Sequence, residues 1–350
     1  MKKTMMIITF IFSMCINLYA KTITVDTNYP SIGDYQSIMD AHNNADPGDT
    51  ILVYPSQTTY SGGTVSKKLH IIGAGFGHDF SKDGVYPTTS TSISFSAGSE
   101  ESTLEGFEIS SITIRADNVM IRHNRISSSV NLYANNVTIK SNECSSVVNI
   151  YSGYKDNIIK QNRFIKTSGV CITVYSDNRV TISNNIIITS LGNSTSHKAI
   201  VIENLTNVAI INNYIEAYYP VACSQNVSGI VVNNIINSPM TSCAYIEHSN
   251  NISSKTSIPE GNGNILNVDL DTVFVDRSSY DFHLSSNSPA LGSGYNGDDM
   301  GIYGGTTPYL DRMNLPESAP SVIHLSVPTM VPSGSNNLKV SIEAKSGNNN

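Results

Sequence analysis

The sequence predicts an all-β fold in which short strands wind into a solenoid, with a short capping helix at the N-terminal end and a β tail at the C-terminal end. A loosely spelled motif, Val-x-Ile-x-x-Asn-x-Ile, occurs six times between Asn118 and Ile236. Its aligned asparagines are 18, 20, 23, 28 and 21 residues apart, and repetition at such a period is typical of solenoids. Apolar residues inside each copy fall at alternate positions, which is the period of a strand rather than a helix.

The length of the repeat favours a coil of strands over alternating strands and helices. A unit of about 20 residues is too short for a strand followed by a crossover helix, which needs about 30. It fits one turn of a coil made of short strands and tight corners. Each strand then pairs in parallel with its counterpart in the next coil, about 4.8 Å away. Because one coil cannot bury its own apolar face, the core exists only in the stack.

The repeated asparagines predict one corner of the coil. Asparagine tolerates a left-handed backbone and hydrogen-bonds its own turn. We expect the six side chains to stack as an inward amide ladder, each donating to the next; a simple preference of asparagine for turns is the alternative. The six residues are Asn124, Asn142, Asn162, Asn185, Asn213 and Asn234.

The elements before the repeats predict a covered end. Asp34 precedes a short helical pattern, Tyr35 to Asn43, which we expect it to cap. Such a helix covers the open end of the solenoid, where unpaired strand edges otherwise invite aggregation. Strands are expected at 22–25, 49–53, 68–72, 92–95 and 104–107. After the repeats, 322–327 and 338–344 read as the strands of the tail.

These motifs resemble a known family. Copies such as Val119-Met-Ile-Arg-His-Asn124-Arg-Ile126, together with the opening Gly48-Asp-Thr-Ile-x-Val53, are similar to the right-handed parallel β-helix of the pectin-lyase-like superfamily, in its β-helix repeat branch. The resemblance covers roughly Thr22 to Gly305 and implies a right-handed coil. It also implies that the segment from Asp281 to Gly305 closes the molecule by folding across the last coil.

Four segments follow from this organisation. Residues 1–20 are expected to be a signal peptide, because Lys2 and Lys3 precede an apolar run from Met5 to Ile16. The β-helix is expected at 21–305, a linker at 306–321 and a partial β-sandwich-like tail at 322–350. An exported protein of this kind is secreted, held at the cell surface or placed in the periplasm. We expect no membrane insertion after cleavage, and a monomer.

Charge and cysteines narrow the function. The net charge is −7, and removing the two signal lysines makes it more negative, which argues against nucleic acid as a partner. Cys144 occupies an apolar position of the repeat and is expected in the core. Cys223 and Cys243 lie about one coil apart, and a disulfide between them is chemically allowed in an exported protein but is left open. No Cys/His spacing indicates zinc.

One outward column of the repeat is basic and holds weak catalytic candidates. Arg122, Lys140 and Lys160 occupy the same repeat position. Arg122, Lys140 or His123 would serve as the base of a lyase if its pKa were tuned toward the working pH, although each is more often a solvated surface residue. The resemblance implies calcium held by aspartates in the lyases, but no aspartate cluster falls on a common column. We expect no cofactor and assign no metal site; calcium is possible but not indicated.

A second column predicts a binding surface. Tyr133, Tyr151 and Tyr175 follow the same alternating pattern, with Asn131 and Asn149 pointing outward beside them. Aromatic faces stack on sugar rings, and the coil spacing of about 4.8 Å is close to the size of one sugar residue. Like-on-like pairs that merely stabilise a sheet face are the alternative.

The sequence therefore favours an exported β-helix that binds an extracellular polysaccharide along a solvent-facing ladder. A polysaccharide lyase or related carbohydrate-active enzyme is one alternative. A non-catalytic structural or surface module is the other. Whether the protein is an enzyme stays open at this point.

Overall fold

The computed structural model describes most of the chain. It covers residues 20–28, 31–77, 86–192, 196–238, 243, 246–256 and 258–311, and the backbone of the last two strands. Residues 1–19 of the predicted signal peptide and 312–320 of the predicted linker lie outside the described residues. Those last strands, β28 (Ser321–Ser326) and β29 (Ser341–Lys345), pair with each other in antiparallel fashion.

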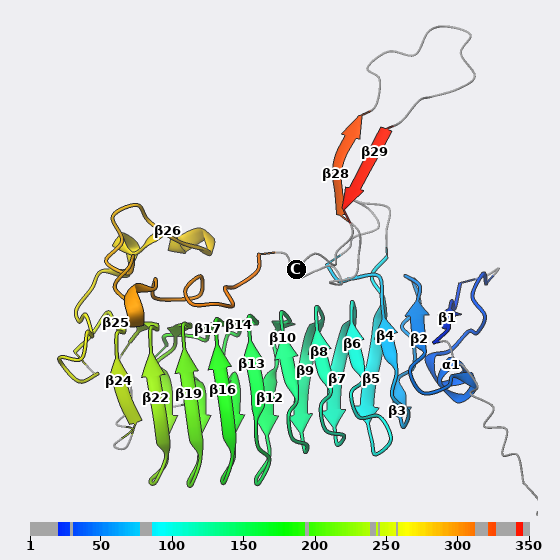
Figure 1. The fold of residues 1–350 in the computed structure, drawn as a ribbon, viewed down its shortest axis with the longest axis horizontal. Coiled ribbons are helices and arrows are strands. Elements are labelled where there is room, and N and C mark those ends of the chain that lie inside the picture. The colour runs from blue at the N-terminus through cyan, green and yellow to red at the C-terminus, as the bar shows by residue number, and fades with distance from the viewer. Residues whose placement is uncertain are drawn as a thin grey trace, which may run out of the picture.

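The described coils form a parallel β-solenoid (Figure 1). One face is an 11-stranded sheet, here called sheet A. Its strands, in spatial order, are β1 (Thr22–Val25), β2 (Thr50–Val53), β4 (His70–Ile72), β6 (Thr103–Glu105), β8 (Met120–Arg122), β10 (Thr138–Lys140), β13 (Asn157–Lys160), β16 (Arg179–Ser183), β19 (Asn207–Ile211), β22 (Ser228–Val232) and β24 (Ile246–Ser249).

The remaining faces belong to a 14-stranded sheet that divides into two ladders after β9. It begins with β3 (Gly63–Val65), β5 (Thr89–Phe95), β7 (Glu108–Ile114) and β9 (Arg125–Leu132). Ladder B follows the corner after sheet A and contains β11 (Glu143–Cys144), β14 (Arg163–Ile165), β17 (Ile186–Ile188), β20 (Tyr214–Glu216), β23 (Ile235–Asn237) and β25 (Ile252–Ser253). Ladder C contains β12 (Val147–Ile150), β15 (Ile172–Val174), β18 (Lys198–Ile202) and β21 (Tyr219–Cys223).

The core is built from apolar side chains at equivalent positions of successive coils. Ile121, Ile139 and Ile159 are paired in register across neighbouring coils, and each is 0% exposed. Burying such side chains stabilises the fold by about 1.5–3 kcal/mol each, which a single coil cannot achieve alone. Val130 of β9 and Val148 of β12, which are paired in register, are equally buried.

The amide ladder is confirmed. Asn162 Nδ2 donates to Asn185 Oδ1 at 3.0 Å, and the same link joins all six predicted asparagines and continues through Asn251 to Asn264. One part of the prediction is wrong, because the left-handed backbone lies at the residue before each ladder asparagine. These preceding residues are His123, Ser141, Gln161, Asn184, Asn212, Asn233 and Asn250.

The capping helix is present but begins later than expected. Helix α1 runs over Ile38–Asn44, and Ser37, not Asp34, is its N-cap. The Asp34 carboxylate accepts hydrogen bonds from the backbone N–H and hydroxyl of Thr24, both at 2.8 Å, so it is not available to the helix. Ile38 is buried, and the helix packs against β1, β2 and β3 at the first coils.

The C-terminal segment differs most from expectation. Residues 268–311, here called the strap, contain η1 (Leu270–Thr272), β26 (Phe274–Asp276), η2 (Arg277–Ser279), β27 (Asp281–Leu284) and η3 (Tyr295–Gly297). The strap does not fold across the last coil but runs back along the solenoid at the asparagine corner (Figure 1). Asn250 donates to the carbonyl of Ser293, and Asn184, three coils earlier in sheet A, donates to that of Ile302.

The outward-facing residues of ladder B explain why the strap runs back along the solenoid. Ile186, Tyr214, Ile235 and Ile252 face outward, and they form a second buried cluster with apolar residues of the strap. An uncovered apolar column of this length would be an aggregation hazard. Residues 306–311, at the start of the predicted linker, continue the strap, since Tyr309 N–H donates to the Ile302 carbonyl at 2.8 Å.

The four described cysteines form one disulfide and two free, buried thiols. Cys223 and Cys243 form a disulfide with a Cα–Cα distance of 5.3 Å, which settles the question that the sequence left open. Cys144 and Cys171 are free and buried, and burial raises the pKa of the Cys171 thiol to about 12. No helix among the described residues has the length and hydropathy needed to span a membrane.

Candidate functional site

The three predicted tyrosines form one stack at the corner between ladder C and sheet A. Each directly follows a ladder C position, and the register pairs Val130 with Val148 and Val148 with Ile172. The rings of Tyr133 and Tyr151 are parallel within 13° at a centroid distance of 4.1 Å. Those of Tyr151 and Tyr175 are parallel within 14° at 5.1 Å. We call these three residues the tyrosine strip.

The stacking limits what the strip can offer a ligand. Both faces of Tyr151 are covered by its neighbours, and the Arg115 guanidinium lies 4.9 Å from the centroid of Tyr133. The rings are half-buried, so Tyr133 and Tyr151 present edges and hydroxyl groups to solvent rather than faces. The Tyr151 hydroxyl, and secondly burial, raise the pKa of Tyr133, which therefore stays a protonated hydrogen-bond donor at neutral pH.

A row of uncharged polar groups lies beside the strip. Asn149 Nδ2 donates to Asn131 Oδ1 at 3.0 Å, and Asn131 Nδ2 donates to the Ser129 hydroxyl at 3.2 Å. Thr173 continues the column, since it pairs with Asn149 in register. All are half-buried. This column is thus a row of amides and hydroxyls over three coils, and it ends where Val201 and Ala222 take the same register position.

The weak catalytic candidates are not gathered around one accessible point. Arg122 and Lys140 are adjacent in the register of sheet A, and Arg122 Nε lies 2.8 Å from the Glu105 carboxylate. His123 is only 2% exposed and occupies a left-handed corner position with φ of 53°. No group of three or more potential metal ligands occurs among the described residues. Within that part of the chain, Asp156 and Asp177 act at corners, pairing with Arg179 and Lys155.

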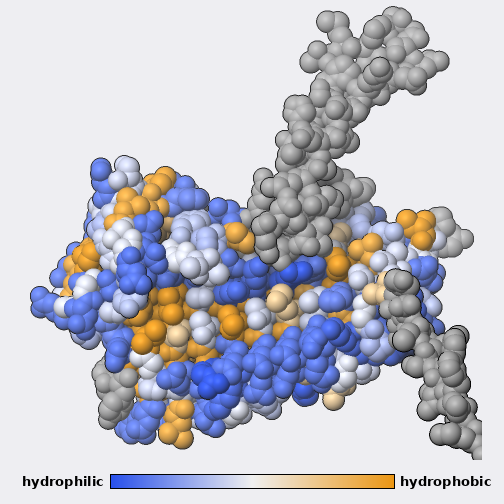
Figure 2. Space-filling view, in the orientation of Figure 1, coloured by the Kyte–Doolittle hydropathy of each residue, from blue (hydrophilic) through white to orange (hydrophobic). Residues whose placement is uncertain are grey.

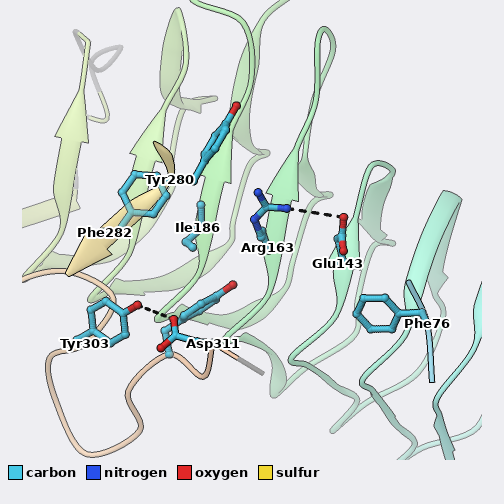
Figure 3. Close-up of a pocket in the computed structure, with 9 residues that line it drawn as sticks. Phe76, Glu143, Arg163, Ile186, Tyr280, Phe282, Tyr303 and Asp311 are labelled. Atoms are coloured by element: carbon cyan, nitrogen blue, oxygen red, sulfur yellow. Dashed lines mark hydrogen bonds and ion pairs between the residues drawn. The ribbon is translucent and has the colours of Figure 1, made fainter. Parts of the chain in front are cut away.

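Sequence reasoning missed a pocket between the strap and ladder B (Figure 3). Its volume is about 300 Å³. Ladder B contributes the ion pair of Glu143 and Arg163, and the strap contributes most of the aromatic rings. We call it the aromatic pocket; its lining residues are Phe76, Glu143, Arg163, Ile186, Tyr280, Phe282, Tyr303, Tyr309 and Asp311.

A larger groove of about 630 Å³ lies between sheet A and the strap. Ile211, Ile230 and Val232 form its floor, and Tyr295 and Thr306 belong to its strap wall. Figure 2 shows the apolar patch on this face and the hydrophilic surface along the corner beneath it. The floor continues the column that begins with Arg122, Lys140 and Lys160, so the basic residues lie toward the N-terminal end of the groove.

The strand ladders and the asparagine corner define an all-β parallel β-helix. Among solved structures, the chain is similar to pectate lyase Pel9A, with 12% identity and a TM-score of 0.57, over 80% of this chain and 95% of that one. A rhamnogalacturonan lyase matches with 11% identity and a TM-score of 0.43, over 67% of this chain and 74% of that one. No protein-family model and no curated protein sequence matches the chain.

Proposed function

We propose that this protein is an exported β-helix that binds an extracellular polysaccharide laid along the tyrosine strip. The observation that carries the proposal is the in-register repetition of Tyr133, Tyr151 and Tyr175 beside Asn131 and Asn149. A polymer of similar sugar units is the kind of ligand whose repeat can match a hydrogen-bonding group in each of these three coils. The fold supports this ligand class, because one of the similar solved structures is named a pectate lyase.

The mode of binding follows from the stacked geometry. Since the faces of Tyr151 are occupied, a sugar is bound through tyrosine hydroxyl groups and edges and through the asparagine amides. Each such hydrogen bond contributes about 0.5–1.5 kcal/mol, so several coils are needed for useful affinity. The groups are uncharged, so we expect only modest weakening with added salt, whereas charge-driven binding would fall steeply.

The lyase alternative rests on the adjacent Arg122 and Lys140 in sheet A. One screen of the mature protein against acidic and neutral polysaccharides distinguishes glycan binding from lyase activity. Binding is followed together with new ultraviolet absorbance from unsaturated chain ends. Binding without new absorbance supports the present proposal, and absorbance that Lys140→Ala abolishes supports the lyase. No binding to any glycan would leave a structural surface module.

Variants locate the bound glycan on the surface. Tyr151→Phe removes one hydroxyl and keeps the stack, and Tyr151→Ala also opens a gap in it. We expect the first to weaken binding several-fold and the second to weaken it further. Lys140→Ala in the basic column and Ile230→Lys in the sheet A groove are the controls. Loss of binding in a control but not in the Tyr151 variants would contradict the strip as the site.

A further inference from the structure

We infer that the aromatic pocket is a second binding site, which takes a single neutral sugar ring. It lies on ladder B under the strap, whereas the tyrosine strip lies at the end of ladder C. The inference therefore does not depend on binding at the strip. A chain end or a side branch of a polysaccharide would supply such a ring.

The shape and lining of the pocket suit one ring. A volume of about 300 Å³ is at the lower end of the range for small-molecule sites, about 300–1,000 Å³. Tyr280 and Tyr303 present accessible ring surface at the pocket (Figure 3), and the nearly buried rings of Phe76, Phe282 and Tyr309 complete its aromatic wall. Aromatic rings of this kind bury the C–H faces of a sugar while polar groups at the rim engage its hydroxyls.

Arg163 supplies unused donors at this pocket. Its guanidinium lies 5.4 Å from the Tyr280 ring centroid and 3.7 Å from the Glu143 carboxylate, which is too long for a hydrogen bond. Within the described residues it donates no side-chain hydrogen bond. Arg125 in the same column makes closer ion pairs, at 3.0 Å to Glu108 and 3.2 Å to Glu143. Arg163 is thus the arginine of this column that is left to bind a ligand oxygen.

The charges favour a neutral ligand. One guanidinium, Arg163, is set against two carboxylates, Glu143 and Asp311, so the lining has no surplus positive charge for a sugar acid. The Asp311 carboxylate accepts a hydrogen bond from the Tyr303 hydroxyl at 2.7 Å and lies 3.7 Å from His283 Nε2. Carboxylates accept hydrogen bonds from sugar hydroxyls, and the guanidinium donates to them.

Tyr280 gives an independent indication of function. It has a left-handed backbone, with φ of 62° and ψ of 24°, and it is 51% exposed on the rim of the pocket. A bulky residue in this conformation is strained, and such strain is concentrated at functional sites. Glycine would fit the backbone better, and the tyrosine ring instead supplies contacts at the pocket rim, to the Arg163 guanidinium and edge-on to Phe282.

The test is calorimetric titration of the mature protein with a panel of neutral methyl pyranosides, with methyl glucuronide as the acidic counterpart. We expect at least one neutral glycoside to bind and the glucuronide to bind at least about tenfold more weakly, a difference of about 1.4 kcal/mol. Tyr280→Gly and Arg163→Met should each lose at least tenfold in affinity. Thermal unfolding should show Tyr280→Gly to be as stable as the parent or more so.

The controls separate this site from the tyrosine strip. Tyr151→Phe should leave monosaccharide binding unchanged, and Tyr280→Gly should leave the strip intact. Absence of binding by every glycoside, preference for the glucuronide, or full affinity in both pocket variants would overturn the inference. Polysaccharide binding that fails only in the Tyr151 variants would then leave the proposed function standing alone.

Discussion

At the residue scale, a ladder asparagine satisfies backbone groups that no strand can reach. Asn162 Oδ1 accepts from the backbone N–H of Asn142 at 2.9 Å. Its Nδ2 donates to the carbonyls of Ile139 and Lys160, at 2.8 and 2.9 Å, as well as to the next asparagine, Asn185. The side chain is 0% exposed, so water cannot replace these bonds. Removing it leaves buried donors and acceptors in two coils unpaired.

We therefore expect Asn162→Ala to lower the free energy of unfolding by roughly 1–3 kcal/mol. The matched control is Asn204→Ala, at an exposed corner asparagine whose side chain makes no hydrogen bond within the described part of the chain. Denaturant unfolding followed by circular dichroism measures both variants. Equal stability of the two would contradict the structural role of the ladder.

Asp49 links stability to pH. Burial alone would raise its pKa, but the backbone N–H groups of Lys21 and Asp46, at 2.9 and 2.7 Å, and the charge of Lys21 outweigh this and lower it. A carboxyl group whose pKa is lower in the folded than in the unfolded state stabilises the fold at pH values above the unfolded pKa, about 3.9. This stabilisation is lost as the pH falls through the pKa of the folded state.

We expect Asp49→Asn to be less stable than the parent at pH 7, with the difference shrinking as the pH falls below about 4. Thermal unfolding of both proteins across this pH range measures the difference. A stability difference that is the same at pH 7 and pH 3 would show that the charge of Asp49 is not responsible.

At the element scale, the strap is attached through the left-handed corner residues of sheet A. The Nδ2 of Asn184 donates to the carbonyls of Ile302 and Gly304, at 3.0 and 2.8 Å. Asn233 Oδ1 accepts from the backbone N–H of Tyr295 at 2.7 Å. In the later coils, the left-handed position is thus occupied by an asparagine. This residue type tolerates the left-handed backbone, and its side-chain amide hydrogen-bonds the strap.

Asn184→Gly keeps the left-handed backbone and removes only the amide, so we expect faster proteolysis of the strap with little change in the solenoid. Asn226→Gly is the control, because Asn226 has a φ of 59° and an exposed side chain outside the strap contact. Limited proteolysis with mass spectrometry locates the cuts. Equal strap cleavage in both variants would mean that the amide does not hold the strap.

At the scale of the whole molecule, repetition decides what the sequence can predict. The six motif copies predict sheet A, the inward residues and the tyrosine stack, because register is transmitted from coil to coil. They do not identify the left-handed residue, since Asn184-Asn185, Asn212-Asn213 and Asn233-Asn234 each offer two adjacent asparagines. The aromatic pocket was not predictable from the repeat, because Arg163 and Tyr280 are far apart in the chain and no repeat relates them.

The dependence of affinity on oligosaccharide length tests the central claim most directly. The tyrosine strip spans two coil steps, about 10 Å at about 4.8 Å each, so a glycan bound along it would contact it with about three consecutive sugars. For the polysaccharide found in the screen, we predict that affinity rises from one to about three sugar units and then levels off, with this rise much reduced in Tyr151→Ala. Affinity that is independent of length, or a rise that Tyr151→Ala leaves unchanged, would contradict binding along the strip.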